Sequence, residues 1–242
     1  MTKANTNKIL IIIVLAQFCC TSVWFAGNAI IGDLQRVFQL DSNAIGYLTS
    51  SVQAGFITGT LIFALLTLAD RFSPSLVFCL SAIAAAVLNA GILIAGGELT
   101  WLILLRFLMG FMLAGIYPVG MKIASDYHEK GLGKALGYLV GALVLGTAFP
   151  HLVKTVSSDL PWATVVYVTS ALSFLGGLAI FFLVPDGPFR KAGQKLDLSV
   201  VFKVFRNRKF RSAAFGYFGH MWELYAFWAF VFSLLFLWYI SL

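Results

Sequence analysis

Long apolar runs alternate with short polar gaps along the whole chain. The runs are nearly free of charged side chains, whereas the gaps collect most of the Lys, Arg, Asp and Glu. About 18 or more consecutive apolar residues is the length that an α-helix needs to cross a bilayer. The pattern predicts an all-α integral membrane protein with about seven transmembrane helices, near residues 9–31, 44–69, 76–96, 101–121, 135–153, 162–184 and 213–240.

Composition agrees with membrane burial. The chain is 60% hydrophobic and only 11% charged, which excludes an ordinary soluble domain. Its net charge of +7 does not indicate nucleic-acid binding, because the basic residues lie in the gaps and form no aromatic-interleaved patch. Cys19, Cys20 and Cys79 all lie inside apolar runs and describe neither a disulfide framework nor a metal site. We therefore expect no metal and no cofactor.

The basic residues also predict the orientation. One alternating set of gaps carries fourteen Lys and Arg, while the opposite set carries only Arg36 and Lys154. The positive-inside rule then places the N-terminus in the cytoplasm, in the plasma (inner) membrane. The first run continues through Trp24 and Phe25, which is long for a cleaved signal peptide, so we interpret it as a retained helix.

The pattern divides the chain into a six-helix part, 1–184, a basic cytoplasmic loop, 185–212, and a seventh helix, 213–242. Within the loop, Val200, Val201, Val204 and Phe205 recur at helical spacing among cations. This spacing is typical of an amphipathic helix that turns its cations toward anionic lipid. A plain linker is an equally good interpretation.

Other seven-helix and enzymatic functions fit poorly. Receptors and retinal proteins place the N-terminus outside, and residues 212–242 contain no Lys for a Schiff base. His220 and Glu223 have a spacing compatible with metal ligation. However, His128 and His151 fall near opposite membrane faces, so no three-ligand site is visible. The sequence indicates no enzyme.

Two charged residues inside the apolar runs are candidates for function, because ionisable groups are costly in lipid. Arg106 lies about five residues into the fourth run, and a structural role is the main alternative for it. Asn28 and Asp33 are its expected partners. Glu223 lies about ten residues into the seventh run, near the middle of the bilayer, which favours proton, ion or substrate handling. His220, one turn away, is placed to share a proton with it.

Aromatic and small residues complete the candidate set. Trp24, Tyr117 and Tyr138 are candidates for lining a cavity, although packing against core or lipid is the more common role. Small-xxx-small spacing lets helix backbones approach closely, and Pro inside a run is expected to break its helix. The residues that carry these signals are Gly55, Gly59, Gly137, Gly141, Gly146, Pro118 and Pro150.

Several motifs together resemble the major facilitator superfamily of secondary transporters. Leu68-Ala-Asp70-Arg71 is similar to part of the family's loop motif between the second and third helices, although Leu66, Ser73, Pro74 and Ser75 depart from it. Arg106-Phe-Leu-Met-Gly110 matches the family's arginine-then-glycine motif in the fourth helix. The glycines of the fifth run with Pro150 resemble its glycine–proline gating helix.

The resemblance implies a fold and a mechanism. It implies two inverted three-helix repeats, the first to third and the fourth to sixth spans, with a substrate site at the midplane between two rocking halves. The chain would equal the N-terminal half plus the seventh helix. Asp70 and Arg71 would engage the other half and have no partner within this chain.

We therefore expect alternating-access transport of a small solute, possibly anionic, coupled to a proton or cation. Arg106 would orient the anionic group and Glu223 would carry the proton. The chain would be a truncated product, a fragment, or a half that pairs with a second half-transporter chain in the lipid bilayer. The alternative is a membrane-embedded scaffold that does not transport.

Overall fold

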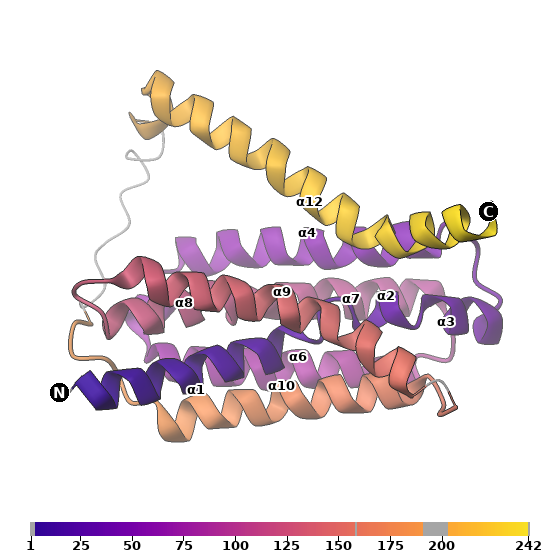
Figure 1. The fold of residues 1–242 in the computed structure, drawn as a ribbon, viewed down its shortest axis with the longest axis horizontal. Helices are drawn as coiled ribbons and strands as arrows, with labels where there is room; N and C mark the ends of the chain where they lie inside the picture. The colour runs from indigo at the N-terminus through magenta and orange to yellow at the C-terminus, as the bar shows by residue number, and fades with distance from the viewer. Residues whose placement is uncertain (1–2, 158, 191–202, 242) are drawn as a thin grey trace. The chain divides into compact units, whose positions relative to one another are not determined.

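Helices account for most of the computed structural model, which describes residues 3–157, 159–190 and 203–241, and no strand occurs in those ranges (Figure 1). The chain divides into two compact units, Met1–Gln194 and Lys195–Leu242, which we describe separately. The helices of the first unit are α1 (Lys3–Thr21), α2 (Ala26–Ala29), α3 (Ile31–Phe38), α4 (Ala44–Leu65), α5 (Leu68–Arg71), α6 (Pro74–Ala90), the 3₁₀ helix η1 (Gly91–Ile94), α7 (Leu99–Leu113), α8 (Tyr117–Asp126), α9 (Leu132–Val156) and α10 (Ala163–Leu183).

The predicted all-α membrane fold is confirmed. Five segments of the described residues are long and apolar enough to cross a membrane: Ala44–Leu65, Pro74–Ile94, Leu99–Asp126, Leu132–Val156 and Ala163–Leu183. They coincide with the second to sixth predicted spans. A shorter apolar helix, Thr6–Thr21, lies in the first run. The full count of seven stays a prediction.

The first run is broken into three helices. α1 ends at Thr21, residues 22–25 form turns, and α2 and α3 continue the chain. Two hydroxyls turn back at the break, because Thr21 Oγ1 donates to the Gln17 carbonyl (2.8 Å) and Ser22 Oγ donates to that of Cys19 (2.7 Å). Such back-bonding competes with the helical ladder and favours a bend.

The fourth run is also broken. α7 ends at Leu113 and α8 begins at Tyr117, with Pro118 in the first turn of α8. Proline suits that position because it has no N–H to donate. The expectation that Pro150 breaks the fifth run is wrong, since Pro150 lies inside the continuous helix α9.

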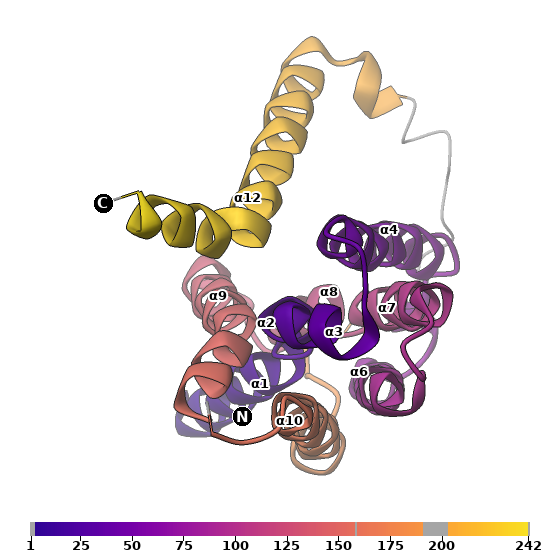
Figure 2. The ribbon, with the colours of Figure 1, turned by 90° about the vertical axis from the view of Figure 1, so that its right-hand side faces the viewer.

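The end-on view shows how the first unit is arranged (Figure 2). α4 pairs with α7, while α6 packs on both α7 and α10. α1 contacts α9 and α10, and α2 contacts both α4 and α9. α2 and α8 therefore lie between the two flanking helices α4 and α9 (Figure 2).

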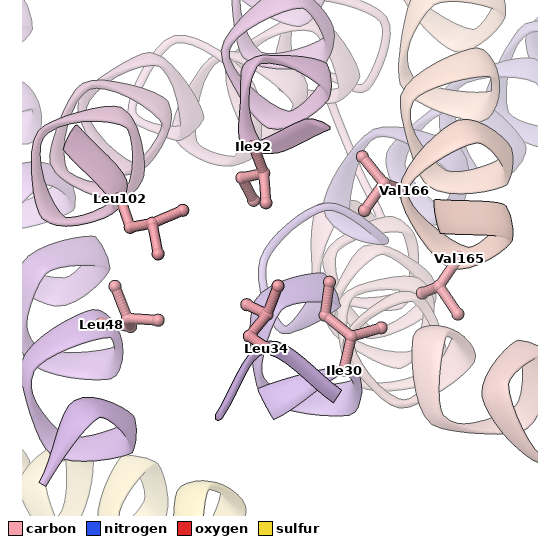
Figure 3. Close-up of a cluster of buried hydrophobic side chains, with 7 residues drawn as sticks. All are labelled: Ile30, Leu34, Leu48, Ile92, Leu102, Val165 and Val166. Carbon is pink, nitrogen blue, oxygen red and sulfur yellow. The ribbon is translucent and has the colours of Figure 1, made fainter. Parts of the chain in front are cut away.

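A cluster of buried aliphatic side chains closes one end of this bundle (Figure 3). It draws on the segment from α2 to α3, on α4, on η1, on α7 and on α10. Its members are Ile30, Leu34, Leu48, Ile92, Leu102, Val165 and Val166. The cluster fixes the helix ends beside the break in the first run.

The second unit contains α12 (Arg208–Ile240), a helix of 33 residues. Residues 203–206, the first residues of this unit that the structure describes, are helical and precede it. Val200 and Val201 of the amphipathic helix predicted in the basic loop lie outside the described residues, whereas Val204 and Phe205 are helical. The boundaries predicted for the three parts of the chain stay predictions.

Candidate functional site

Arg106 is buried inside the six-helix bundle. It lies on α7 and only 1% of it is exposed. Its Nη1 donates to Asn89 Oδ1 (3.2 Å) and to the Val23 carbonyl (3.4 Å), and its Nη2 donates to the Trp24 carbonyl (3.4 Å). The Nε atom has no hydrogen-bond partner among the described residues. The guanidinium is therefore bound to the break in the first run.

The break in the first run and the hydrogen bonds of Arg106 are directly related. Residues 22–25 are turns rather than helix, and their carbonyls bond irregularly: that of Val23 accepts the Ala26 N–H (3.3 Å) and that of Phe25 accepts the Ala29 N–H (3.0 Å). Two of these carbonyls, those of Val23 and Trp24, receive the Arg106 guanidinium. Gly27 makes room for it, because a Cβ there would lie 2.8 Å from Arg106 Cζ.

A chain of hydrogen bonds extends this site to the sixth span. Asn89 on α6 accepts from Arg106 and donates through Nδ2 to Thr169 Oγ1 (3.1 Å) and Ser170 Oγ (2.9 Å) on α10. All four residues are buried. The network joins α6, α7 and α10 to the break between α1 and α2. Buried polar networks of this kind rigidify a core when their groups are satisfied.

The electrostatics of this network are unusual. Among the described residues, no Asp or Glu oxygen lies within 4.0 Å of the Arg106 guanidinium. Its acceptors are neutral carbonyls and an amide. A buried cation is ordinarily paired with an anion, since desolvation of the charge is costly. Within the described residues, the acceptors that face the Arg106 charge are therefore dipoles and not a carboxylate.

The expected partners of Arg106 bind other residues, and this corrects the sequence analysis. Asn28 Nδ2 donates to Thr49 Oγ1 (2.7 Å). Asp33 forms an ion pair with Lys154 (2.6 Å). Depth in the membrane suggested both residues, but their directions around the helix axis lead them to α4 and α9. Asn89, the actual side-chain partner, was missed because it lies on the preceding helix.

A second polar cluster lies at the opposite end of the bundle. Lys122 on α8 pairs with Asp70 of α5 (2.9 Å) and lies 3.7 Å from Asp126. Asp70 thus has a partner within this chain, contrary to expectation. One Asp126 carboxylate oxygen is buried without a hydrogen-bond partner among the described residues. Arg71 is exposed.

Residues 184–190 bind back across this cluster, and we call them the strap. Ser75 Oγ donates to the Val184 carbonyl (2.7 Å), and Ser73 Oγ donates to Asp186 (2.7 Å). The other strap contacts are the Tyr127 hydroxyl with the Pro185 carbonyl, the Phe189 amide with the Asp126 carbonyl (3.0 Å), Arg190 with Asp186, and Arg190 with the Phe72 carbonyl (2.8 Å). No sequence motif predicted the strap, because the residues that it contacts are far from it along the chain.

The comparisons with known proteins are decisive for the family. The sequence profile of the Major Facilitator Superfamily matches residues 13–242. This chain belongs to the major facilitator superfamily.

Two sequence relatives and one solved structure show how much of a superfamily transporter is present. The chain is 25% identical over 196 residues to the Uncharacterized transporter YgaY of Escherichia coli O157:H7, covering 77% of this chain and 48% of that protein. It is 32% identical over 118 residues to the Niacin transporter NiaP of Acinetobacter baylyi, covering 45% of this chain and 25% of that protein. The chain thus spans about half the length of YgaY, and its match to NiaP spans 25% of that protein.

The similar structure is a bacterial homolog of the human lysosomal transporter Spinster, crystallised in an inward-facing and unoccupied conformation. It matches with a TM-score of 0.67 at 17% identity, over 85% of this chain and 49% of that chain. At this identity the likeness shows the fold. The superfamily helix bundle, and with it an integral membrane protein, is therefore established for this chain.

The aromatic candidates have different surroundings within this superfamily half. Trp24 is 1% exposed and packs on Phe56 of α4, with 4.7 Å between ring centroids. Tyr117 is half-buried at the start of α8. Tyr138 is exposed on α9, where Lys134 lies 5.9 Å from its ring centroid. A shared role in lining a cavity stays a prediction for all three.

His220 and Glu223 lie on α12, in the second unit of the chain. Both are exposed, and the i, i+3 spacing places them on one side of the helix. Their role in coupling stays a prediction.

The glycines fall into two groups. Gly55 and Gly59 on α4 and Gly110 on α7 lie where the two backbones meet, so a Cβ at any of them would overlap the facing main chain. Gly146 on α9 lies against Phe18 and Thr21 of α1 in the same way. Gly137 and Gly141 differ, because a Cβ there would meet nothing within 4 Å. These two provide no close helix contact among the described residues, and their gating role stays a prediction.

Proposed function

We propose that this chain is half of a secondary transporter that moves a small anionic solute across the plasma membrane by alternating access. The observation that carries the proposal is the buried Arg106 guanidinium, which has no carboxylate within 4.0 Å among the described residues. A desolvated cation without a counter-ion binds an anion favourably. The relatives named as transporters support transport as the activity.

The break beside Arg106 supports a substrate site at this depth. Broken helices in transporters line substrate or ion sites near the midplane. The first and fourth runs, which would hold equivalent positions in the proposed inverted repeats, are both interrupted. Arg106 belongs to the fourth run and donates hydrogen bonds to the break in the first run. In the proposed mechanism it presents positive charge to the substrate while holding the first run in place.

Coupling is proposed to involve α12. Glu223 would take up and release a proton, with His220 one turn away as its proton partner. Proton binding at Glu223 would offset the charge of the anionic solute. With the N-terminus in the cytoplasm, this arrangement would allow inward symport.

A second six-helix half, in a longer polypeptide or in a second chain, is proposed to complete the transporter. The surface that it would cover includes the exposed side of α9 around Gly137 and Gly141, where the described residues leave open space. Tyr47 and Ile57 of α4, on the other flank, are exposed as well. Small residues on an exposed membrane helix allow close approach of a partner helix.

Reconstituted uptake tests this function. The chain together with its proposed second half, in the longer polypeptide or as a co-expressed partner chain, is reconstituted in proteoliposomes with an acidic exterior. Uptake is tested with radiolabelled niacin, because a relative carries that name, and with a panel of small carboxylates. We expect uptake that needs the pH gradient and falls at least about tenfold in Arg106→Gln, as for loss of one charge-assisted interaction. Arg36→Gln, which removes an exposed cation from α3, serves as the control and should retain uptake. Absence of gradient-dependent uptake by the completed transporter for every solute would favour the non-transporting scaffold.

A further inference from the structure

Five cations gather where the second unit enters its long helix. Lys203, Arg206, Arg208, Lys209 and Arg211 fall within nine residues, and all five are exposed. The sequence from Leu198 to Trp222 contains no Asp or Glu. None of the five forms an ion pair with the described carboxylates. We call these residues the basic elbow.

Local contacts give the basic elbow a defined shape. The helical turn of residues 203–206 ends at Asn207, and α12 begins at Arg208. Asn207 Oδ1 accepts hydrogen bonds from the main-chain N–H groups of Lys209 (3.0 Å) and Phe210 (3.4 Å), which is the geometry of a helix N-cap. Phe205 and Phe210 meet edge to face across the bend, with ring centroids 5.4 Å apart. Cations that precede the bend and cations that follow it therefore lie within a short stretch of chain.

If α12 crosses the membrane as the predicted seventh span, the elbow would lie at the depth of the lipid headgroups. The apolar stretch of α12 begins near Ala213, so Arg208 and Arg211 precede it by about 8 Å and 3 Å at 1.5 Å per residue. The headgroup layer on each side of a bilayer is about 5–8 Å thick. Arg208 and Arg211 would therefore lie among the lipid phosphates, with the Phe205–Phe210 ring pair close to them along the chain.

We propose that the basic elbow is a binding surface for the headgroups of anionic phospholipids. Unpaired, exposed cations next to a membrane helix attract the negative surface of a bilayer. The nearby aromatic pair gives the surface an apolar side that a soluble anion does not use. This interaction is separate from transport and would hold the start of α12 at the membrane surface.

Lipid titration of the full chain tests the proposal. Delipidated protein in detergent is titrated with phosphatidylglycerol, and bound lipid is counted by native mass spectrometry, with phosphatidylcholine and glycerol phosphate as parallel probes. The wild-type chain should bind phosphatidylglycerol in preference to both. Each cation near the surface contributes about fivefold in affinity, so R206Q/K209Q should weaken phosphatidylglycerol binding by about 25-fold. Arg206→Lys should largely retain it.

A matched double variant separates position from charge. K130Q/K134Q removes two cations from the exposed segment that leads into α9, the same loss of charge at another site. It should change phosphatidylglycerol binding by less than about twofold, since neither cation belongs to the elbow. Three results would overturn the proposal: unchanged binding in R206Q/K209Q, an equal loss in both double variants, or glycerol phosphate binding as tightly as the lipid. The last would indicate a site for soluble anions.

Discussion

A Cβ added to Gly27 would lie 2.8 Å from both Cζ and Nε of Arg106, so the guanidinium occupies the space that a side chain at residue 27 would need. Gly27→Ala should therefore displace the arginine from the carbonyls of the break. Overpacking of a tight core costs about 1–3 kcal/mol. Thermal unfolding of the purified chain should show the loss. Gly32→Ala is the control, because nothing lies within 4 Å of a Cβ there, and it should be neutral or mildly stabilising.

Arg106→Gln and Arg106→Lys separate two roles of the arginine. Both variants remove the Arg106 donors from the carbonyls of Val23 and Trp24 and from Asn89 Oδ1, although the Val23 carbonyl keeps the Ala26 N–H (3.3 Å). A buried acceptor that is left unsatisfied costs about 1–3 kcal/mol. Lysine retains the charge but lacks the planar fork that reaches several acceptors at once. We expect both to lower stability and only Arg106→Lys to keep measurable uptake of an anionic solute. Equal uptake by the two variants would mean that the charge is not used for transport.

The contact between α4 and α7 depends on residues that lack side chains. Gly110→Ala would place a Cβ against the Val52 carbonyl. We expect it to destabilise the chain by about 1–3 kcal/mol. Gly141→Ala faces open space and should change unfolding by less than about 0.5 kcal/mol. A similar loss in both variants would show that the cost comes from glycine replacement in general.

Lys122 is shared by two carboxylates, and a double-mutant cycle measures the sharing. The Lys122–Asp70 contact is 2.9 Å and the Lys122–Asp126 contact is 3.7 Å. Lys122 and Asp70 are partly exposed, so we expect a coupling energy of about 0.2–1 kcal/mol for this pair. We expect a smaller value for Lys122–Asp126, whose contact is longer although Asp126 is buried. Cycles with Lys122→Gln, Asp70→Asn and Asp126→Asn in unfolding experiments give the two values. A coupling energy of zero between Lys122 and Asp70 would mean that Asp70 of the loop motif acts through other contacts.

The strap should loosen at high pH. Burial raises the pKa of the Tyr127 phenol above its ordinary value, and the nearby charges of Asp186 and Asp126 raise it further. The neutral phenol, which donates to Pro185, is therefore favoured by folding. Its contribution to stability is complete below the ordinary pKa of about 10 and is lost as pH rises through the folded-state pKa. Unfolding midpoints followed with increasing pH should fall more in the wild-type chain than in Tyr127→Phe.

The sequence predicted the helices better than it predicted their partners. The second to sixth spans follow from apolar run length, and Arg106 was identified from the cost of a charge in lipid. The break at residues 22–25 was not predicted, because it contains no Gly or Pro and continues the apolar run. It depends on hydroxyl back-bonding and on a guanidinium from a helix more than eighty residues away.

Partner choice depends on direction around each helix axis, which residue depth does not specify. Asn28 and Asp33 have a suitable depth for Arg106, yet they face Thr49 and Lys154 instead. Gly27 gave no signal in the sequence either, since its importance comes from one side chain that packs against it. These assignments need the packing of several helices at once.

The bonds from Arg106 to Val23 and Trp24 have a mechanical consequence. The two segments of an interrupted helix can ordinarily tilt or rotate relative to each other about the break. Here residues 22–25 accept hydrogen bonds from Arg106, a side chain of α7. Arg106 also donates to Asn89 of α6, and Asn89 in turn donates to α10. A tilt of α7 should therefore displace residues 22–25 as well, so that the interrupted first span and the fourth span move together.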